Sequence, residues 1–289
     1  MRALRVAAAA LVTALLGATP ALAGTPYPQN YICPLGGEEF TLESTMSYST
    51  WGQRPDGKPF GSWITPFPLP QCPSNRLIMF DDFTQAELTA LERLIADPAY
   101  LQIVNAQPLY YAAFWLAERL QRPVEQRANL LMQAVWQSEV PSDARETMLR
   151  RFAIFVDAEL ADDTSAAALG IRAFGANAYR ELGEFETAQA RLLAVRALLA
   201  DGANKAIDAE TREGVTDYLD RLEPVIARRD TALEPLDFVP EERAISQCVI
   251  YRARLTEWER DFCNAPQRAA RVNEEMQTFK GGQQGLDPR

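Results

Sequence analysis

Apolar residues recur at helical spacing along most of the chain, from Thr84 to about residue 279. Spacings of three and four residues place side chains on one face of an α-helix, so this region is predicted to be a series of amphipathic helices. The first helix is expected to begin at Thr84, because Thr84 and Glu87 have the pattern of a capping box. Further helix starts are predicted near Asp97, Pro108, Pro123, Ser142 and Asp208.

Residues 169–199 have the clearest pattern and predict one antiparallel helical hairpin. Apolar and small residues on both sides of Gly183, among them Tyr179, Phe185 and Ala188, lie where two packed helices would share a seam. Gly183 is expected to end the first helix, because glycine readily adopts the left-handed conformation found at helix ends.

This hairpin resembles a tetratricopeptide repeat. Tyr179, Gly183, Phe185 and Ala188 match that family's tyrosine, turn glycine, aromatic and alanine, whereas Arg172 stands at the family's tryptophan position. The resemblance implies a mostly α fold of tetratricopeptide-like antiparallel helical hairpins, a short α-solenoid, over residues 84–279. Such arrays present a concave surface to a protein or peptide partner. A plain helical hairpin is the alternative interpretation.

The chain begins with the pattern of a secretory signal peptide. Arg2 and Arg5 precede an apolar run over residues 6–16, and a cleavage site of the A-x-A type ends at Ala23. Residues 1–23 are therefore predicted to be removed, which leaves a periplasmic or secreted product. No later segment is apolar enough to predict a transmembrane anchor.

Residues 24–83 differ from the rest, because prolines and aromatics are dense and helical periodicity is absent. This composition predicts a small module of loops and short strands, with a turn at residues 54–57. We expect the module to be an appendage that the helical region does not need for folding. The last ten residues, 280–289, are expected to be a disordered tail.

Two Cys-Pro sequences in this module, at Cys33 and Cys72, resemble the knuckles of a zinc ribbon. With the helical region, they resemble a bacterial family of unknown function that carries such a ribbon at its start. The ribbon is degenerate, since Gly36 and Asn75 stand in place of the second cysteine of each knuckle. Two thiolates cannot close a structural zinc site, so we expect no metal and no other cofactor.

The four cysteines allow three pairings if all form disulfides. The ribbon resemblance implies Cys33 with Cys72, which leaves Cys248 with Cys263. A continuous helix over the amphipathic stripe 245–262 opposes the second pair, because it would separate these cysteines by about 22 Å. Either this helix is broken, or the module is crosslinked to the C-terminal region by crossed pairs. We expect Cys33–Cys72 and Cys248–Cys263.

Charge and composition narrow the classes of function. Without Arg2 and Arg5 the chain has 27 basic and 39 acidic residues, a net charge of −12, which argues against a nucleic-acid partner. Histidine is absent, so catalytic triads and metal sites that use it are excluded. Adjacent acids that could act on a glycan occur at Glu38-Glu39, Asp81-Asp82 and Asp162-Asp163.

The sequence therefore predicts an exported, non-enzymatic helical-repeat protein that binds a protein or peptide partner in the cell envelope. The alternative is a periplasmic enzyme that acts on cell-wall polymer through carboxylates. A deep cleft with convergent acids would favour the enzyme, and a shallow groove with exposed aromatics would favour binding.

Overall fold

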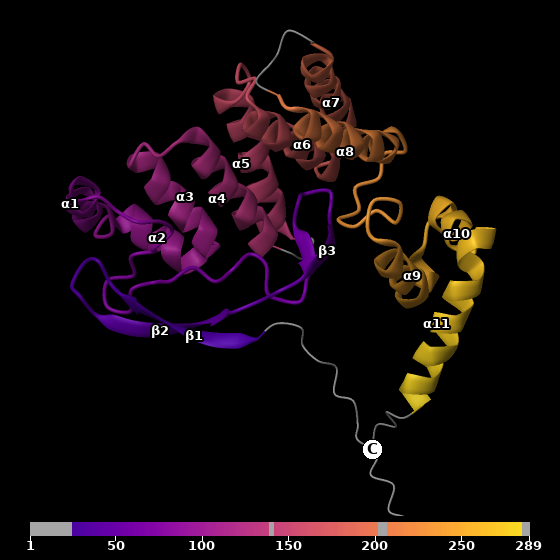
Figure 1. The fold of residues 1–289 in the computed structure, drawn as a ribbon, viewed down its shortest axis with the longest axis horizontal. Coiled ribbons are helices and arrows are strands. Elements are labelled where there is room, and N and C mark those ends of the chain that lie inside the picture. The colour runs from indigo at the N-terminus through magenta and orange to yellow at the C-terminus, as the bar shows by residue number, and fades with distance from the viewer. Residues whose placement is uncertain (1–24, 139–141, 202–206, 285–289) are drawn as a thin grey trace, which may run out of the picture.

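The computed structural model describes residues 25–138, 142–201 and 207–284 of the 289-residue chain. The predicted signal peptide lies outside these residues. The described part is mostly helical, as predicted, with a small β module at its N-terminal end (Figure 1). The strands are β1 (Pro26–Ile32), β2 (Glu39–Thr45), β3 (Thr50–Gln53) and β4 (Pro59–Gly61).

The helices follow in chain order after the module. They are α1 (Gln85–Leu94), α2 (Pro98–Ala106), α3 (Leu109–Arg119), α4 (Val124–Gln137), α5 (Asp143–Glu159), α6 (Ala166–Glu181), α7 (Phe185–Ala200), α8 (Ala209–Ala227), α9 (Glu241–Ile250), the 3₁₀ helix η1 (Arg252–Arg254), α10 (Glu257–Asn264) and α11 (Pro266–Gln284). The predicted capping box at Thr84 and Glu87 is present at the start of α1.

The module consists of two separate antiparallel pairs, β1 with β2 and β3 with β4. Its two Cys-Pro loops have the same backbone geometry. In each loop the cysteine N–H donates to the carbonyl five residues later, at 2.8 Å in the first and 2.9 Å in the second. Gly37 and Arg76 occupy the fourth position after the cysteine, with φ of 73° and 61°. Cys33 and Cys72 form the expected disulfide, with Cα atoms 5.5 Å apart.

The module and the first helices share one apolar core. Leu77 and Ile78 are fully buried and belong to the same cluster as Leu91 and Tyr100 from α1 and α2. The Tyr100 hydroxyl also donates to the carbonyl of Arg76, at 2.8 Å. The module therefore supplies part of the core on which the first helices pack. Folding of the helical region without the module stays a prediction.

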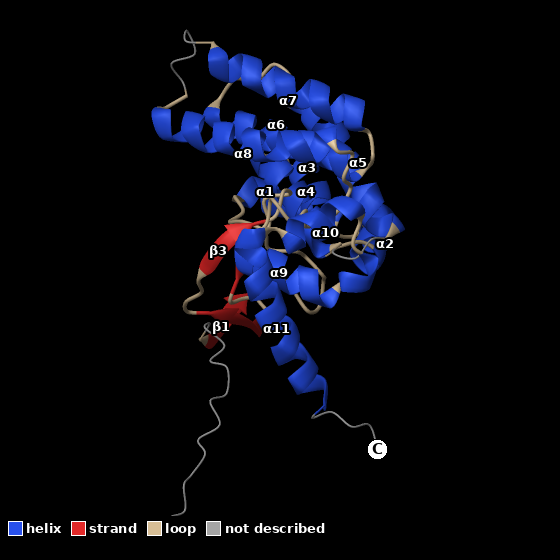
Figure 2. Cartoon of the chain, turned by 90° about the vertical axis from the view of Figure 1, so that its right-hand side faces the viewer, coloured by secondary structure: helices blue, strands red, loops and turns tan. Residues whose placement is uncertain are grey.

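Helices α3 to α8 pack in chain order, each against the next, and form successive antiparallel hairpins. Figure 2 shows α6, α7 and α8 at the top of the molecule and the strands in its lower half. Helices α3, α6 and α8 end in the same way, on a residue with left-handed backbone: Gln121 (φ 54°), Gly183 (φ 76°) and Arg229 (φ 58°). In all three, the next N–H donates to the carbonyl five residues earlier, which is the Schellman motif.

The predicted signature residues lie together in the α6–α7 hairpin. Gly183 forms the turn, and Phe185 and Ala188 are buried in the second apolar cluster, between α6, α7 and α8. Tyr179 packs at the edge of this cluster, and its hydroxyl donates to Asp157 of α5 at 2.7 Å. The four residues therefore join α6 to both of its neighbours.

The C-terminal region forms a third apolar cluster built from α9, α10 and α11. The amphipathic stripe is broken after Ile250 by the 3₁₀ turn η1 and an extended Leu255. This break resolves the conflict noted above, because the chain reverses and brings Cys248 and Cys263 together, with Cα atoms 5.8 Å apart.

Helix α11 continues to Gln284, so the first five residues of the segment expected to be a disordered tail are helical. Residues 285–289 lie outside the described part. Within the described residues, no helix is both long and apolar enough to cross a membrane.

Candidate interaction surface

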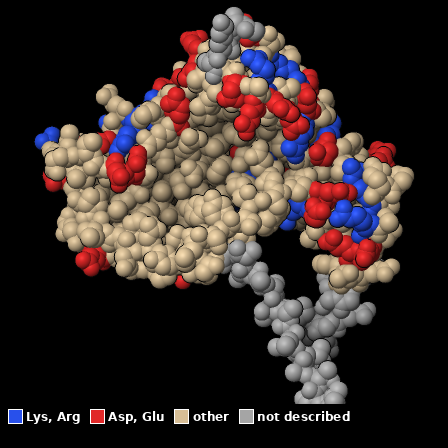
Figure 3. All heavy atoms as spheres, in the orientation of Figure 1, with Lys and Arg blue, Asp and Glu red and all other residues tan. Residues whose placement is uncertain are grey.

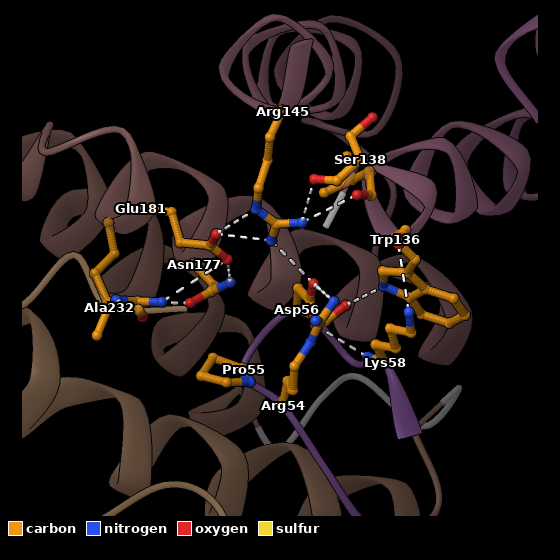
Figure 4. A network of polar contacts seen from close by, with 12 residues as sticks. Arg54, Pro55, Asp56, Lys58, Trp136, Ser138, Arg145, Asn177, Glu181 and Ala232 are labelled. Carbon is orange, nitrogen blue, oxygen red and sulfur yellow. Dashed lines mark hydrogen bonds and ion pairs between the residues drawn. The ribbon is translucent and has the colours of Figure 1, made fainter. Parts of the chain in front are cut away.

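A buried ionic network joins the β module to the helices (Figure 4). The turn between β3 and β4 places Asp56 among helix side chains, where Arg54 forms a two-pronged ion pair with it (3.1 and 2.6 Å). Arg145 of α5 donates to Asp56 at 3.1 Å and to Glu181 of α6 at 2.7 Å. All four side chains are about 95% buried, so the ion pairs are shielded from water and salt.

Further hydrogen bonds tie this network to α4, α6 and α8. The indole of Trp136 donates to the Asp56 carbonyl at 2.9 Å, and the Tyr218 hydroxyl donates to the Pro55 carbonyl at 2.5 Å. On the other side, Arg180 of α6 donates to the carbonyls of Asp230 and Ala232 at 2.6 and 2.9 Å. The network therefore fixes both the β3–β4 turn and the loop after α8.

The protonation of the network suits a structural role. Burial alone would raise the pKa of Asp56, but the charges and hydrogen bonds of Arg54 and Arg145 outweigh it and hold that pKa below its ordinary value. Burial and the nearby charge of Arg54 lower the pKa of Lys58 to about 8. A carboxyl that stays ionised is suited to pairing with arginine and not to general acid catalysis.

Exposed apolar side chains are concentrated on the module that this network holds. Of the thirteen large hydrophobic side chains exposed in the described part of the chain, six lie within residues 27–64. We call these six side chains the neutral surface: Tyr27, Ile32, Met46, Tyr48, Trp51 and Ile64. It extends over both faces of the β1–β2 hairpin, because Tyr27 and Ile32 are an odd number of residues apart on β1 and project to opposite sides. Concentration in one small module distinguishes these six side chains from the scattered exposed apolar residues that any protein has.

Charged groups are scarce around the neutral surface. Residues 25–75 include only six charged side chains, of which Arg54 and Asp56 are buried and Lys58 is half-buried. Figure 3 shows the result: the lower part of the molecule, over β1 and β2, is almost free of charge, while Lys, Arg, Asp and Glu gather over the helices. This face can lose its water with few ions to desolvate, since its exposed charges are those of Glu39 and Glu43 on β2 and of Arg221 beside Trp51.

Backbone contacts bring several of these side chains together. The N–H of Met46 donates to the Thr25 carbonyl, which places Met46 at the open end of the β1–β2 hairpin, next to Tyr27. Ser49 and Ser62 are paired by two hydrogen bonds of 3.0 Å, which brings the segments carrying Tyr48 and Ile64 side by side. Tyr48 also packs edge-on against Phe67, with ring centroids 5.1 Å apart.

The free edges of the β1–β2 hairpin are protected against strand addition. The pairing register leaves the backbone of Pro26, Pro28, Asn30 and Ile32 facing the outer edge of β1. Two of these four positions are prolines and have no N–H to offer. The outer edge of β2 carries the acidic Glu39 and Glu43, which also discourage edge pairing. Side chains, rather than a strand edge, are the feature of this module available for binding.

Two open grooves of about 630 and 400 Å³ lie on the helical side and meet at Thr231. The charged side chains that line these grooves are largely paired with other side chains of the protein. Arg228 pairs with Asp230 and Asp237 and stacks 3.9 Å above the Trp258 ring, and Glu259 belongs to the capping box of α10. These grooves are open rather than deep, which is the geometry associated above with binding.

The acid pairs considered as catalytic candidates take part in local structure. Glu38 accepts from the Ser74 N–H at 2.9 Å, Asp81 accepts from Arg122 at 3.1 Å, and Asp163 accepts from the Ser165 N–H at 2.8 Å. None of the three pairs lines the two grooves. Among the described residues, no group of three or more cysteine or acidic side chains could hold a metal ion.

The sequence predicts the two disulfides and the hairpin but not the buried network, since residues 54–57 by themselves indicate only a turn. A signal was present: between Ser44 and Asn75 the only charged residues are Arg54, Asp56 and Lys58. Charges confined to one turn of an otherwise uncharged segment indicate a specific partner elsewhere in the chain.

Comparison of the chain with known protein families, with curated proteins and with solved structures finds no match.

Proposed function

We propose that this chain is an exported, non-enzymatic binding protein of the bacterial cell envelope and that it docks a protein partner through the neutral surface. The observation that carries the proposal is the concentration of exposed Tyr, Trp, Ile and Met side chains on a module that has few exposed charges and is held by the buried network. Protein interfaces have this composition at their centre, where aromatic residues and methionine are enriched and Lys, Glu and Asp are depleted.

Export is supported by two independent features. The N-terminal sequence predicts a signal peptide, and the two disulfides suit an oxidising compartment. The antiparallel α6–α7 hairpin and the paired Cys-Pro loops also support the proposed tetratricopeptide-like and ribbon-like character of the chain.

The partner is expected to present an apolar, uncharged patch of its own. The neutral surface offers no cluster of charge that could select a partner electrostatically, so shape and apolar contact would decide the fit. The prolines and acids on the edges of β1 and β2 disfavour an extended strand as partner. A folded protein surface with its own exposed apolar residues remains the best match.

A pull-down from envelope extract tests the proposal. The double variant Tyr48→Ser/Trp51→Ser removes two of the most exposed aromatic side chains of the module and should lose the captured partner. The matched control is Ile154→Ser/Leu193→Ser, which removes two equally exposed apolar side chains from α5 and α7 (59% and 52% exposed) and should keep it. Equal capture by both variants would contradict the assignment of this surface.

A further inference from the structure

A third cavity of about 260 Å³, separate from the neutral surface and the two grooves, lies between α5, α6 and α7. Its lining includes Asp157 from α5, Arg172 and Gly175 from α6, and Arg191 and Ala194 from α7. Two arginines facing one small cavity would repel each other unless both charges were balanced.

The charge of Arg191 is balanced within the protein. Its guanidinium forms a two-pronged ion pair with Asp157, with both donor–acceptor distances at 2.7 Å. The second oxygen of Asp157 also accepts from the Tyr179 hydroxyl at 2.7 Å. Asp157 is thus occupied by Arg191 and Tyr179, and it is held rigidly as one wall of the cavity.

The charge of Arg172 is not balanced in the same way. Within the described part of the chain, its single hydrogen bond is from Nη1 to the backbone carbonyl of Asp163, at 3.1 Å, and no carboxylate lies within ion-pair distance. Its side chain is half-buried. Burial lowers the pKa of Arg172, and the positive charge of Arg191 lowers it further. The negative charges of Asp157, Asp162 and Asp163 raise that pKa but do not outweigh the two effects.

We propose that this cavity binds a small oxyanion, a carboxylate or phosphate group, through the free N–H groups of Arg172. A guanidinium has five N–H donors in a planar fork that matches two oxygens of such a group, and Arg172 uses few of them within the protein.

The size and rigidity of the cavity restrict the ligand. A volume of about 260 Å³ lies just below the range of about 300 to 1,000 Å³ typical of sites for drug-sized molecules, so inorganic phosphate or a short carboxylic acid fits better than a larger compound. The walls are preformed, because the helices meet closely at Gly175: a Cβ there would lie 3.0 Å from a methyl group of Val156.

Isothermal titration calorimetry of the full protein in low-chloride buffer tests the site, with inorganic phosphate and succinate as separate probes and acetate as the single-carboxylate comparison. Saturable binding of one of them is expected, and its identity distinguishes a phosphate site from a carboxylate site. Arg172→Gln should weaken that binding by at least about tenfold, since it removes a charge-assisted contact.

The matched control is Arg260→Gln, because Arg260 also donates to a backbone carbonyl and its loss changes the net charge equally. If Arg172→Gln fails to fold, Ala194→Glu keeps Arg172 and places a carboxylate in the cavity, which should abolish binding. The proposal is overturned if no probe binds saturably, or if Arg172→Gln and Arg260→Gln bind equally well. In that case Arg172 serves only to cap the Asp163 carbonyl.

Discussion

At the scale of single residues, the left-handed backbone at three helix ends restricts most clearly which residue types fit there. Gln121, Gly183 and Arg229 all adopt it, although only one of them is glycine. A residue with a Cβ pays roughly 1 kcal/mol or more for this conformation. The turn after α6 is therefore relaxed, whereas the turns after α3 and α8 are held in place by the helices that pack on either side.

Exchanging residue types at these turns should change stability in opposite directions. Gly183→Ala is expected to destabilise the fold by about 1 kcal/mol through its backbone alone, because the nearest atom to the new Cβ would be 4.0 Å away. Gln121→Gly should be neutral or stabilising by up to about 0.5 kcal/mol, since the relief of strain is partly offset by a more flexible unfolded chain. Urea unfolding at neutral pH measures both.

Gly214→Ala is the control for the glycine substitution. Gly214 lies inside α8, its φ is ordinary, and no atom lies within 4 Å of the new Cβ. This change should stabilise the fold by about 0.5 to 1 kcal/mol. If Gly183→Ala were also stabilising, the left-handed turn would be the wrong description of that helix end.

At the scale of elements, the C-terminal helices depend on their disulfide more than the others do. Helices α9, α10 and α11 form an apolar cluster of their own, which is much smaller than the main core. The Cys248–Cys263 disulfide closes a loop with a sequence separation of 15, for which the chain-entropy treatment gives about 3 kcal/mol of stabilisation.

The variant Cys248→Ser/Cys263→Ser should therefore loosen one region selectively. We expect faster hydrogen exchange at the backbone amides of α9 and α10, with α3 to α6 almost unchanged, as measured by mass spectrometry of peptic fragments. Equal loss of protection in both regions would show that the three clusters unfold as one unit. Unchanged protection in α9 would show that the disulfide adds nothing to this region.

The elements that the sequence predicted well are those with local signals. The start of α1 depends on Thr84 and Glu87, three residues apart, and the α6–α7 turn depends on Gly183. The sequence left two alternatives for the region after α9, a broken helix or crossed disulfide pairs, because the stripe 245–262 keeps its helical spacing throughout. What decided between them is the pairing of Cys248 with Cys263, a contact that periodicity does not encode.

The position of the module could not be predicted, because it depends on contacts between distant parts of the chain. Arg145 is 89 residues from Asp56, and Tyr218 is 163 residues from Pro55. No periodic pattern links such residues. The neutral surface could not be predicted for the same reason, since the exposure of Tyr48 and Trp51 depends on how the module packs on the helices.

At the scale of the whole molecule, Asp56 holds the module to the helical region. Asp56→Asn should destabilise the protein by about 3 to 5 kcal/mol, because Arg54 would remain buried without a carboxylate and Arg145 would keep only Glu181. The control Asp220→Asn removes an exposed partner of Arg196 and should cost less than about 1 kcal/mol.

The difference in unfolding free energy between the wild type and Asp56→Asn should depend on pH. The pKa of Asp56 lies below its ordinary value of 3.8 in the folded chain, so its stabilisation is fully present above that value and is lost as the pH falls through the folded pKa. The gap in unfolding free energy between the wild type and Asp56→Asn should thus be constant from pH 5 to 7 and narrow below about pH 4. A gap that does not narrow in acid would contradict the role given to the ionised carboxylate.

Site-specific photo-crosslinking in intact cells tests whether a protein partner docks on the neutral surface. A photoreactive phenylalanine analogue would replace Tyr48 or Trp51 and, as controls, Ile154 or Leu193, which are exposed on the helices. We expect one and the same adduct from positions 48 and 51 and none from 154 or 193. Adducts from 154 or 193 without any from 48 and 51 would contradict docking on the neutral surface and place the binding site on the helical face.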